Sequence, residues 1–219
     1  MTINGTVTKT FLSVCLVVIS GYYSWINISI TNTLMLPCVL VGLVLGIVTI
    51  YKKHLSPITV PIYAVIQGIF LGAISYTFNS LYDGIVITAI SYTLSILFVM
   101  LTLYRTGIIK PTENFKLGVA AGTGGIAFIY VANFIMSFFG TGLSIMDINN
   151  ASIYSIGFSL LVIVMASLNL VVDFDFIEEG SEKGAPKYME WFGAFGLLVT
   201  LIWLYLEILR LLAKLNSRK

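Results

Sequence analysis

Two acidic residues lie inside apolar sequence towards the end of the chain, where a carboxylate is unusual. Asp173 lies in the apolar run Asn169–Ile177, and Glu207 lies within Leu201–Leu212. An ionised carboxylate at membrane depth costs at least about 2.5 kcal/mol on insertion scales, so it usually faces a protein interior and has a partner. We therefore predict that Asp173 and Glu207 are each other's partners.

A carboxylate pair of this kind has a definite chemistry. Two buried carboxylates in contact cannot both ionise at low cost, so the pair would hold a proton near neutral pH. Protonated, Asp173 and Glu207 would share a hydrogen bond that ties the last two spans together. Deprotonated, they would repel each other and offer oxygen ligands to a divalent cation such as calcium. Lys53, after the second span, would neutralise the ionised pair and act as a latch.

Neighbouring residues support this interpretation but also leave a simpler one open. Asn169 and Asp173 share one helical face, whereas Asp175 points elsewhere. Arg210 follows Glu207 by three residues, so these two could form an ion pair within one helix. Asp173 would then be a residue at the membrane boundary. We take Asn169, Asp175 and Arg210 as supporting residues, and both interpretations stay open at this stage.

The predicted pairing has a geometric condition. In an unbent helix, Glu207 would lie about 28 Å along the axis from Tyr188, at about 1.5 Å per residue, and could not meet Asp173. A bend near the membrane interface would remove this difficulty. Gly193 and Gly196 are the expected positions for it.

The composition predicts an integral membrane protein. The chain has 219 residues, of which 58% are hydrophobic and 10% are charged. A soluble domain is about 45–50% apolar and about 25% charged. Cys15 and Cys38 both lie in apolar runs, so we interpret them as small core residues and predict neither a disulfide nor a metal site.

Seven stretches approach the roughly 20 apolar residues that span a bilayer as a helix. They are Thr10–Ile28, Leu34–Tyr51, Pro57–Phe78, Gly84–Tyr104, Leu117–Phe139, Ser152–Ile177 and a segment within Tyr188–Leu212. They are continuously apolar, unlike the alternating strands of a barrel. The prediction is an all-α integral membrane protein with seven transmembrane helices, in one domain over 1–219. We expect small residues to let its helices pack closely: Gly68, Gly72, Gly118, Gly122 and Gly125.

Basic residues in short loops predict the orientation. They follow the second and fourth spans: Lys52, Lys53, Arg105, Lys110 and Lys116. The intervening loops hold only Asp83 and Asp147, so the N-terminus is predicted to be cytoplasmic. A seventh crossing puts the last basic residues outside, against the rule: Lys214, Arg218 and Lys219. We nevertheless expect seven crossings.

Several segments carry a resemblance to a known family. They are Leu34–Pro37 leading to Lys52-Lys53, Val172–Asp175, Leu204–Glu207 and the run Gly184–Gly196. Together they resemble the Bax inhibitor family (transmembrane Bax inhibitor motif), in its bacterial YccA-like branch. The similarity covers nearly the whole chain and is strongest from Asn169 onward.

The resemblance implies a fold and a function. The fold has seven helices, with the last helix central and ringed by the other six. The function is a calcium leak in the bacterial cytoplasmic (inner) membrane, controlled by a di-aspartyl pH sensor. Asp173 matches the first aspartate, Glu207 stands in place of the second, and Lys53 stands where an arginine is typical. Glu207 is one methylene longer than aspartate, and Lys53 cannot make the bidentate contact of arginine.

Two other functions compete with a pH-sensitive calcium leak. One is a proton-coupled transporter of small molecules that uses the same acids, and the other is a non-conducting regulator of membrane proteins. We expect no enzyme, because the Gly-x-Gly-Asp of intramembrane aspartyl proteases is absent and the single histidine, His54, lies in a cationic loop. The expected partners are lipid, calcium and protons, with no cofactor and no nucleic acid.

Overall fold

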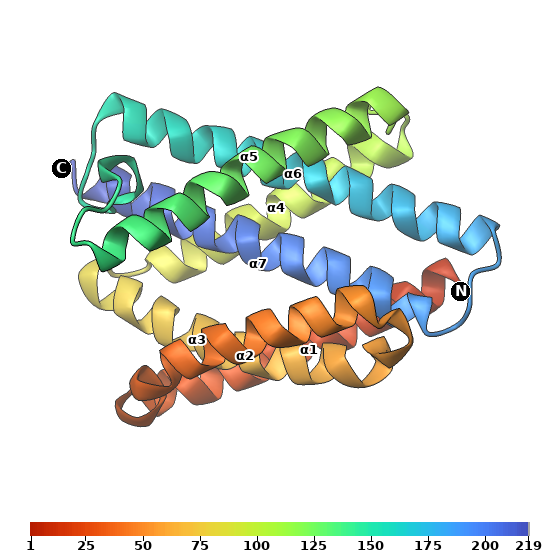
Figure 1. The fold of residues 1–219 in the computed structure, drawn as a ribbon, viewed down its shortest axis with the longest axis horizontal. Coiled ribbons are helices and arrows are strands. Elements are labelled where there is room, and N and C mark those ends of the chain that lie inside the picture. The colour runs from red at the N-terminus through yellow and green to blue at the C-terminus, as the bar shows by residue number, and fades with distance from the viewer. Residues whose placement is uncertain (219) are drawn as a thin grey trace. The chain divides into compact units, whose positions relative to one another are not determined.

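The computed structural model describes residues 1–218, except for the side chains of Ile30 and Asn32. Lys219, one of the late basic residues, lies outside the described part. Within it the chain forms helices and no strand (Figure 1). The helices are α1 (Ile3–Ile26), α2 (Ile28–Tyr51), α3 (Ser56–Leu81), α4 (Ile85–Arg105), α5 (Glu113–Phe138), α6 (Ile153–Glu182) and α7 (Met189–Asn216), with short 3-10 turns at Lys53–Leu55 and Ser144–Met146.

All seven α-helices contain a stretch long and apolar enough to cross a membrane. This confirms the predicted fold class. Several ends differ from the prediction because hydrogen bonding, not apolar character, decides where a helix ends. The first helix begins at Ile3 instead of Thr10, since the Thr2 side chain accepts a hydrogen bond from the Gly5 N–H. Likewise α6 and α7 continue through polar residues to Glu182 and Asn216.

The described chain divides into two compact units. Unit 1 comprises Met1–Leu81 and Asp173–Val199, and unit 2 comprises Tyr82–Val172 and Thr200–Lys219. Each unit therefore contains part of α6 and part of α7. The single domain over 1–219 and the central position of the last helix stay predictions. Each unit is described below by itself.

Unit 1 is held together by a close approach of α1 to α3. A Cβ atom on Gly68 would lie 1.9 Å from Ser20 Oγ and 2.5 Å from the Val17 carbonyl oxygen. A Cβ on Gly72 would lie 2.2 Å from the Gly21 carbonyl oxygen. Only glycine fits at these two positions, so the predicted packing role of Gly68 and Gly72 is confirmed.

Unit 2 packs α5 against α6 at one glycine. A Cβ on Gly122 would lie 2.3 Å from the terminal methyl of Met165. A Cβ on Gly118 or Gly125 would meet nothing within 4 Å in the described part of the chain. The same role predicted for those two glycines is therefore wrong. Sequence spacing places them on α5 but does not say which side of α5 meets a neighbour.

Candidate functional site

Glu207, in unit 2, is held by two side chains. It is 1% exposed. Its Oε1 accepts hydrogen bonds from the Tyr130 hydroxyl at 2.5 Å and from Arg210 Nη1 at 2.7 Å. The Arg210 guanidinium also lies 5.5 Å from the centre of the Tyr130 ring. The ion pair within α7 that the sequence left open is therefore present, and Tyr130 of α5 completes it.

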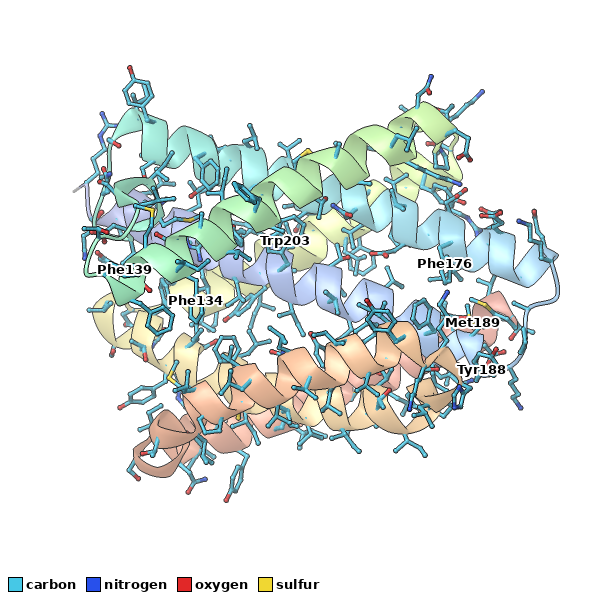
Figure 2. The ribbon with its side chains drawn as sticks, in the orientation of Figure 1. Phe134, Phe139, Phe176, Tyr188, Met189 and Trp203 are labelled. Atoms are coloured by element: carbon cyan, nitrogen blue, oxygen red, sulfur yellow. The ribbon has the colours of Figure 1, made fainter. Side chains whose placement is uncertain are left out.

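The second oxygen of this carboxylate is in a different state. Glu207 Oε2 is buried and has no hydrogen-bond partner, and the same holds for Trp203 Nε1. Both residues belong to the unit 2 part of α7, and Figure 2 labels Trp203. The site thus combines a neutralised carboxylate with one unused acceptor.

Asp173 lies in unit 1, on α6, and is half-buried. A Cβ atom on Gly196 of α7 would lie only 2.9 Å from Asp173 Oδ1. The missing side chain at Gly196 therefore lets the Asp173 carboxylate approach the α7 backbone.

The predicted interfacial bend at Gly193 or Gly196 is not a break in the helix. α7 runs without interruption from Met189 to Asn216. Gly193 instead gives packing space, because a Cβ there would lie 3.1 Å from Ile177 and 3.2 Å from Thr6. Asp173 belongs to unit 1 and Glu207 to unit 2, so their pairing stays a prediction.

Lys53 lies in the 3-10 turn after α2, within unit 1. Its Nζ is 5.0 Å from the centre of the Phe192 ring on α7, which is a cation–π contact. Phe192 in turn stacks edge-to-face with Phe176 of α6, at 5.7 Å between ring centres. Lys53 therefore places a positive charge beside the first part of α7. Its role as a latch stays a prediction.

Among the supporting residues, Asn169 has a clear structural role. Its Nδ2 donates to Thr123 Oγ1 at 2.7 Å and to the Met165 carbonyl at 2.9 Å, which joins α6 to α5 inside unit 2. Asp175 is half-buried on the unit 1 part of α6. Neither observation assigns these two residues to an ion path.

Sequence reasoning missed a buried lysine in unit 2. Lys214 is 0% exposed, and its Nζ donates to the carbonyl oxygens of Ile145 at 2.8 Å and Ser155 at 3.2 Å, and to Ser159 Oγ at 2.9 Å. The sequence analysis treated it as a loop charge. Its apolar context, Leu211-Leu-Ala-Lys214-Leu215, is the signal that could have revealed its burial.

A buried acid in unit 1 was also missed. Glu190 is 3% exposed and forms an ion pair with Lys9. Its Oε1 accepts from the Thr2 backbone N–H at 3.0 Å and from the Thr2 hydroxyl at 3.1 Å. A Cβ on Gly5 would lie 2.5 Å from this carboxylate, so a larger residue there would displace the Glu190 side chain. Glu190 ties the beginnings of α1 and α7 together.

Calcium ligation by Asp173 and Glu207 stays a prediction. In the described part of the chain, no three His, Cys, Asp or Glu residues lie close enough together to hold a metal ion. At Glu207 a cation would also compete with Arg210, which already neutralises the carboxylate.

Comparison with known proteins identifies a family. The family described as Bax inhibitor 1 like matches residues 1–217 of the chain. Among curated proteins, none matches it. The family match covers nearly all of the sequence and both compact units.

Proposed function

The chain belongs to the Bax inhibitor 1-like family, and on this premise we propose that it is a pH-sensitive cation leak of the bacterial cytoplasmic membrane, with calcium as the permeant ion. The family resemblance found in the sequence is confirmed by the match. The YccA-like bacterial branch stays a prediction. Seven helices able to cross a membrane support a multi-pass membrane protein.

The observation that carries the proposal is the state of Glu207. Its carboxylate is buried in an apolar helix, paired through one oxygen with Tyr130 and Arg210, and unpartnered at the other. Protonation of Glu207 would remove the charge that Arg210 neutralises and leave a half-buried guanidinium without its ion-pair partner. In this proposal, protonation of Glu207 and movement of Arg210 are therefore coupled. A cation would reach Glu207 only after Arg210 has moved away.

In this proposal Asp173 is the second acid of the sensor and Lys53 is the latch. Asp173 approaches α7 at Gly196, and Lys53 lies over Phe192 of the same helix. A change in the charge of Asp173 or in the position of Lys53 would therefore act on the first part of α7. A change in the charge of Glu207 would act on its second part.

Calcium flux into liposomes tests the proposal. We expect the purified protein to admit calcium at a rate that depends on pH. Asp173→Asn and Glu207→Gln should each abolish the flux or its pH dependence. Glu179→Gln is the matched control, because Glu179 lies in an exposed pair with Lys183 and should leave the flux unchanged. No flux, or a flux indifferent to pH and to both substitutions, would eliminate the channel.

The competing functions give different results in the same liposomes. The ion pair of Glu207 with Arg210 favours a non-conducting regulator over the other alternative, since a paired carboxylate is a structural element as well as a sensor. A regulator would show no calcium flux and no proton uptake. A proton-coupled transporter would acidify the lumen only when its organic substrate is present.

A further inference from the structure

Two buried polar atoms in unit 2 have no hydrogen-bond partner, and they are of opposite kind. Glu207 Oε2 is an acceptor, and Trp203 Nε1 carries a donor. In the described part of the chain these are the two buried side-chain nitrogen or oxygen atoms in this state. Buried polar groups nearly always have a partner, so each exception asks for an explanation such as a bound water or ion.

The positions of these two atoms allow one bound molecule to satisfy both. Trp203 and Glu207 are four residues apart on one uninterrupted helix, so they are neighbours on the same face. The Tyr130 hydroxyl bonds the other oxygen of Glu207 and lies within reach of the Trp203 indole, but it does not meet hydrogen-bond geometry with Trp203 Nε1. Arg210 Nη1 lies 3.3 Å from the same hydroxyl. A donor, an acceptor and a hydroxyl are thus gathered around one place in an apolar helix pair.

The charges decide what kind of molecule fits there. Arg210 neutralises the Glu207 carboxylate, so no net negative charge remains to hold a metal ion. The indole N–H would face its positive end towards a cation, and the carboxylate oxygen would repel an anion. A small neutral molecule that both accepts and donates hydrogen bonds satisfies both orphaned atoms, and water makes two to four such bonds in protein interiors.

We propose that Trp203 and Glu207 bind a water molecule between the indole N–H and the free carboxylate oxygen. The water accepts a hydrogen bond from Trp203 Nε1 and donates one to Glu207 Oε2. Tyr130 and Arg210 hold the carboxylate in the orientation that presents Oε2 to it. The water site shares Glu207 with the proposed leak, but it does not rest on calcium conduction, because it needs only the residues named.

Indole NMR tests the site directly. The chain has three tryptophans, Trp25, Trp191 and Trp203, so the indole signals of protein in deuterated detergent micelles can be assigned by substitution. We expect a cross-peak between the Trp203 indole proton and water, with the sign of a long-lived bound water. Glu207→Gln should move the Trp203 signal and leave Trp25 in place. Glu179→Gln, at the surface, should move none of the three.

A further variant separates bound water from a relayed signal. Tyr130→Phe removes the nearby hydroxyl, whose exchanging proton could pass magnetisation from water to the indole. The cross-peak should persist in this variant, because Arg210 still binds Glu207 Oε1 and keeps Oε2 turned towards the water. Its loss there would overturn the proposal, and so would a wild-type Trp203 proton with contacts to the Tyr130 ring but none to water. A Trp203 signal unmoved by Glu207→Gln would overturn it as well.

Discussion

At the scale of single residues, the Glu207 carboxylate depends on a side chain that its own helix does not supply. Arg210 reaches Glu207 from one turn further along α7, whereas Tyr130 reaches it from α5. Arg210 donates to both the carboxylate and the Tyr130 hydroxyl, so the three groups form one network. The hydroxyl therefore fixes the carboxylate and also joins α5 to α7 in unit 2.

Tyr130→Phe should weaken unit 2 without removing the ion pair. A hydrogen bond to a charged group contributes about 1.5–3 kcal/mol, and we expect a loss of that size. Equilibrium unfolding in mixed micelles, by titration with dodecyl sulfate, measures it. Tyr92→Phe is the control, because Tyr92 lies on α4 and is 52% exposed. Equal stability of the two variants would contradict the role given to the Tyr130 hydroxyl.

Lys214 is the second residue whose substitution should lower the stability of unit 2. Its ammonium group satisfies two carbonyl oxygens and one hydroxyl in a fully buried position. Lys214→Met keeps much of the volume but orphans these acceptors, at about 1–3 kcal/mol for each one left unpaired. The same unfolding titration should show the loss. Lys183→Met, which removes one partner of an exposed pair with Glu179, should change stability by less than about 1 kcal/mol.

At the scale of helices, unit 1 depends on two features of α1, the glycine contacts with α3 and the ion pair with α7. The glycine contacts bring the backbones together, so the van der Waals packing that holds helices in lipid is close. The ion pair joins the half-buried Lys9 to the buried Glu190, and the Thr2 N–H and hydroxyl complete it. α1 is therefore fixed both along its length and at its beginning.

Gly68→Ala should separate α1 from α3. The added methyl would lie 1.9 Å from Ser20 Oγ and 2.5 Å from the Val17 carbonyl, and backbone cannot move aside as a side chain can. Overpacking of this kind costs about 1–3 kcal/mol. Gly118→Ala is the matched control, since a Cβ there meets nothing within 4 Å. A pair of variants with the same unfolding free energy would show that the contact at Gly68 is not tight.

The Lys9–Glu190 pair should show strong coupling. Lys9→Met alone leaves the Glu190 carboxylate buried without its cation, and breaking a buried pair from one side costs about 3–5 kcal/mol. The double variant Lys9→Met with Glu190→Met leaves no buried charge, so it should recover much of that loss. Unfolding titrations of the single and double variants form the test. Simple addition of the single losses would mean that the two groups do not interact.

The sequence predicts helices better than it predicts their neighbours, and the reasons are physical. A run of about 20 apolar residues is a property of one segment, so all seven spans can be predicted from the sequence. The ion pair of Glu207 with Arg210 can also be predicted, because helix geometry places residues three apart on one face. Tyr130 lies 77 residues from Glu207, and no local pattern gives the rotation of α5 about its axis. For the same reason, the prediction that Gly118 and Gly125 contact a neighbouring helix was wrong.

At the scale of the whole molecule, the two acids of the predicted sensor belong to different compact units. Asp173 is the first residue of unit 1 on α6, and Glu207 lies in the unit 2 part of α7. Each unit therefore contains one acid of the predicted sensor. The chain passes from one unit to the other after α3, within α6 and within α7. Protonation of either acid would act first on its own unit.

The burial of Lys214 also bears on the predicted orientation in the membrane. In the sequence, a seventh crossing put three basic residues on the outer side, against the positive-inside rule. Lys214 is enclosed by acceptors of its own unit, so it does not act as a loop charge. Arg218 and Lys219 remain as the basic residues at the end of the chain. The basic loops after α2 and α4 then outweigh the end of the chain, which supports seven crossings.

Reporter fusions test this orientation. We expect a C-terminal alkaline phosphatase fusion to be active and a C-terminal fluorescent protein fusion to be dark, because the first folds only outside the cytoplasm and the second only inside. A fusion in the loop Lys183–Lys187 should give the reverse result, since that loop follows the sixth crossing. Lys214→Ser should leave both results unchanged, because a buried lysine does not contribute to the balance of loop charges. A fluorescent C-terminus would mean that α7 does not cross, and Glu207 would then need a different place in the proposed leak.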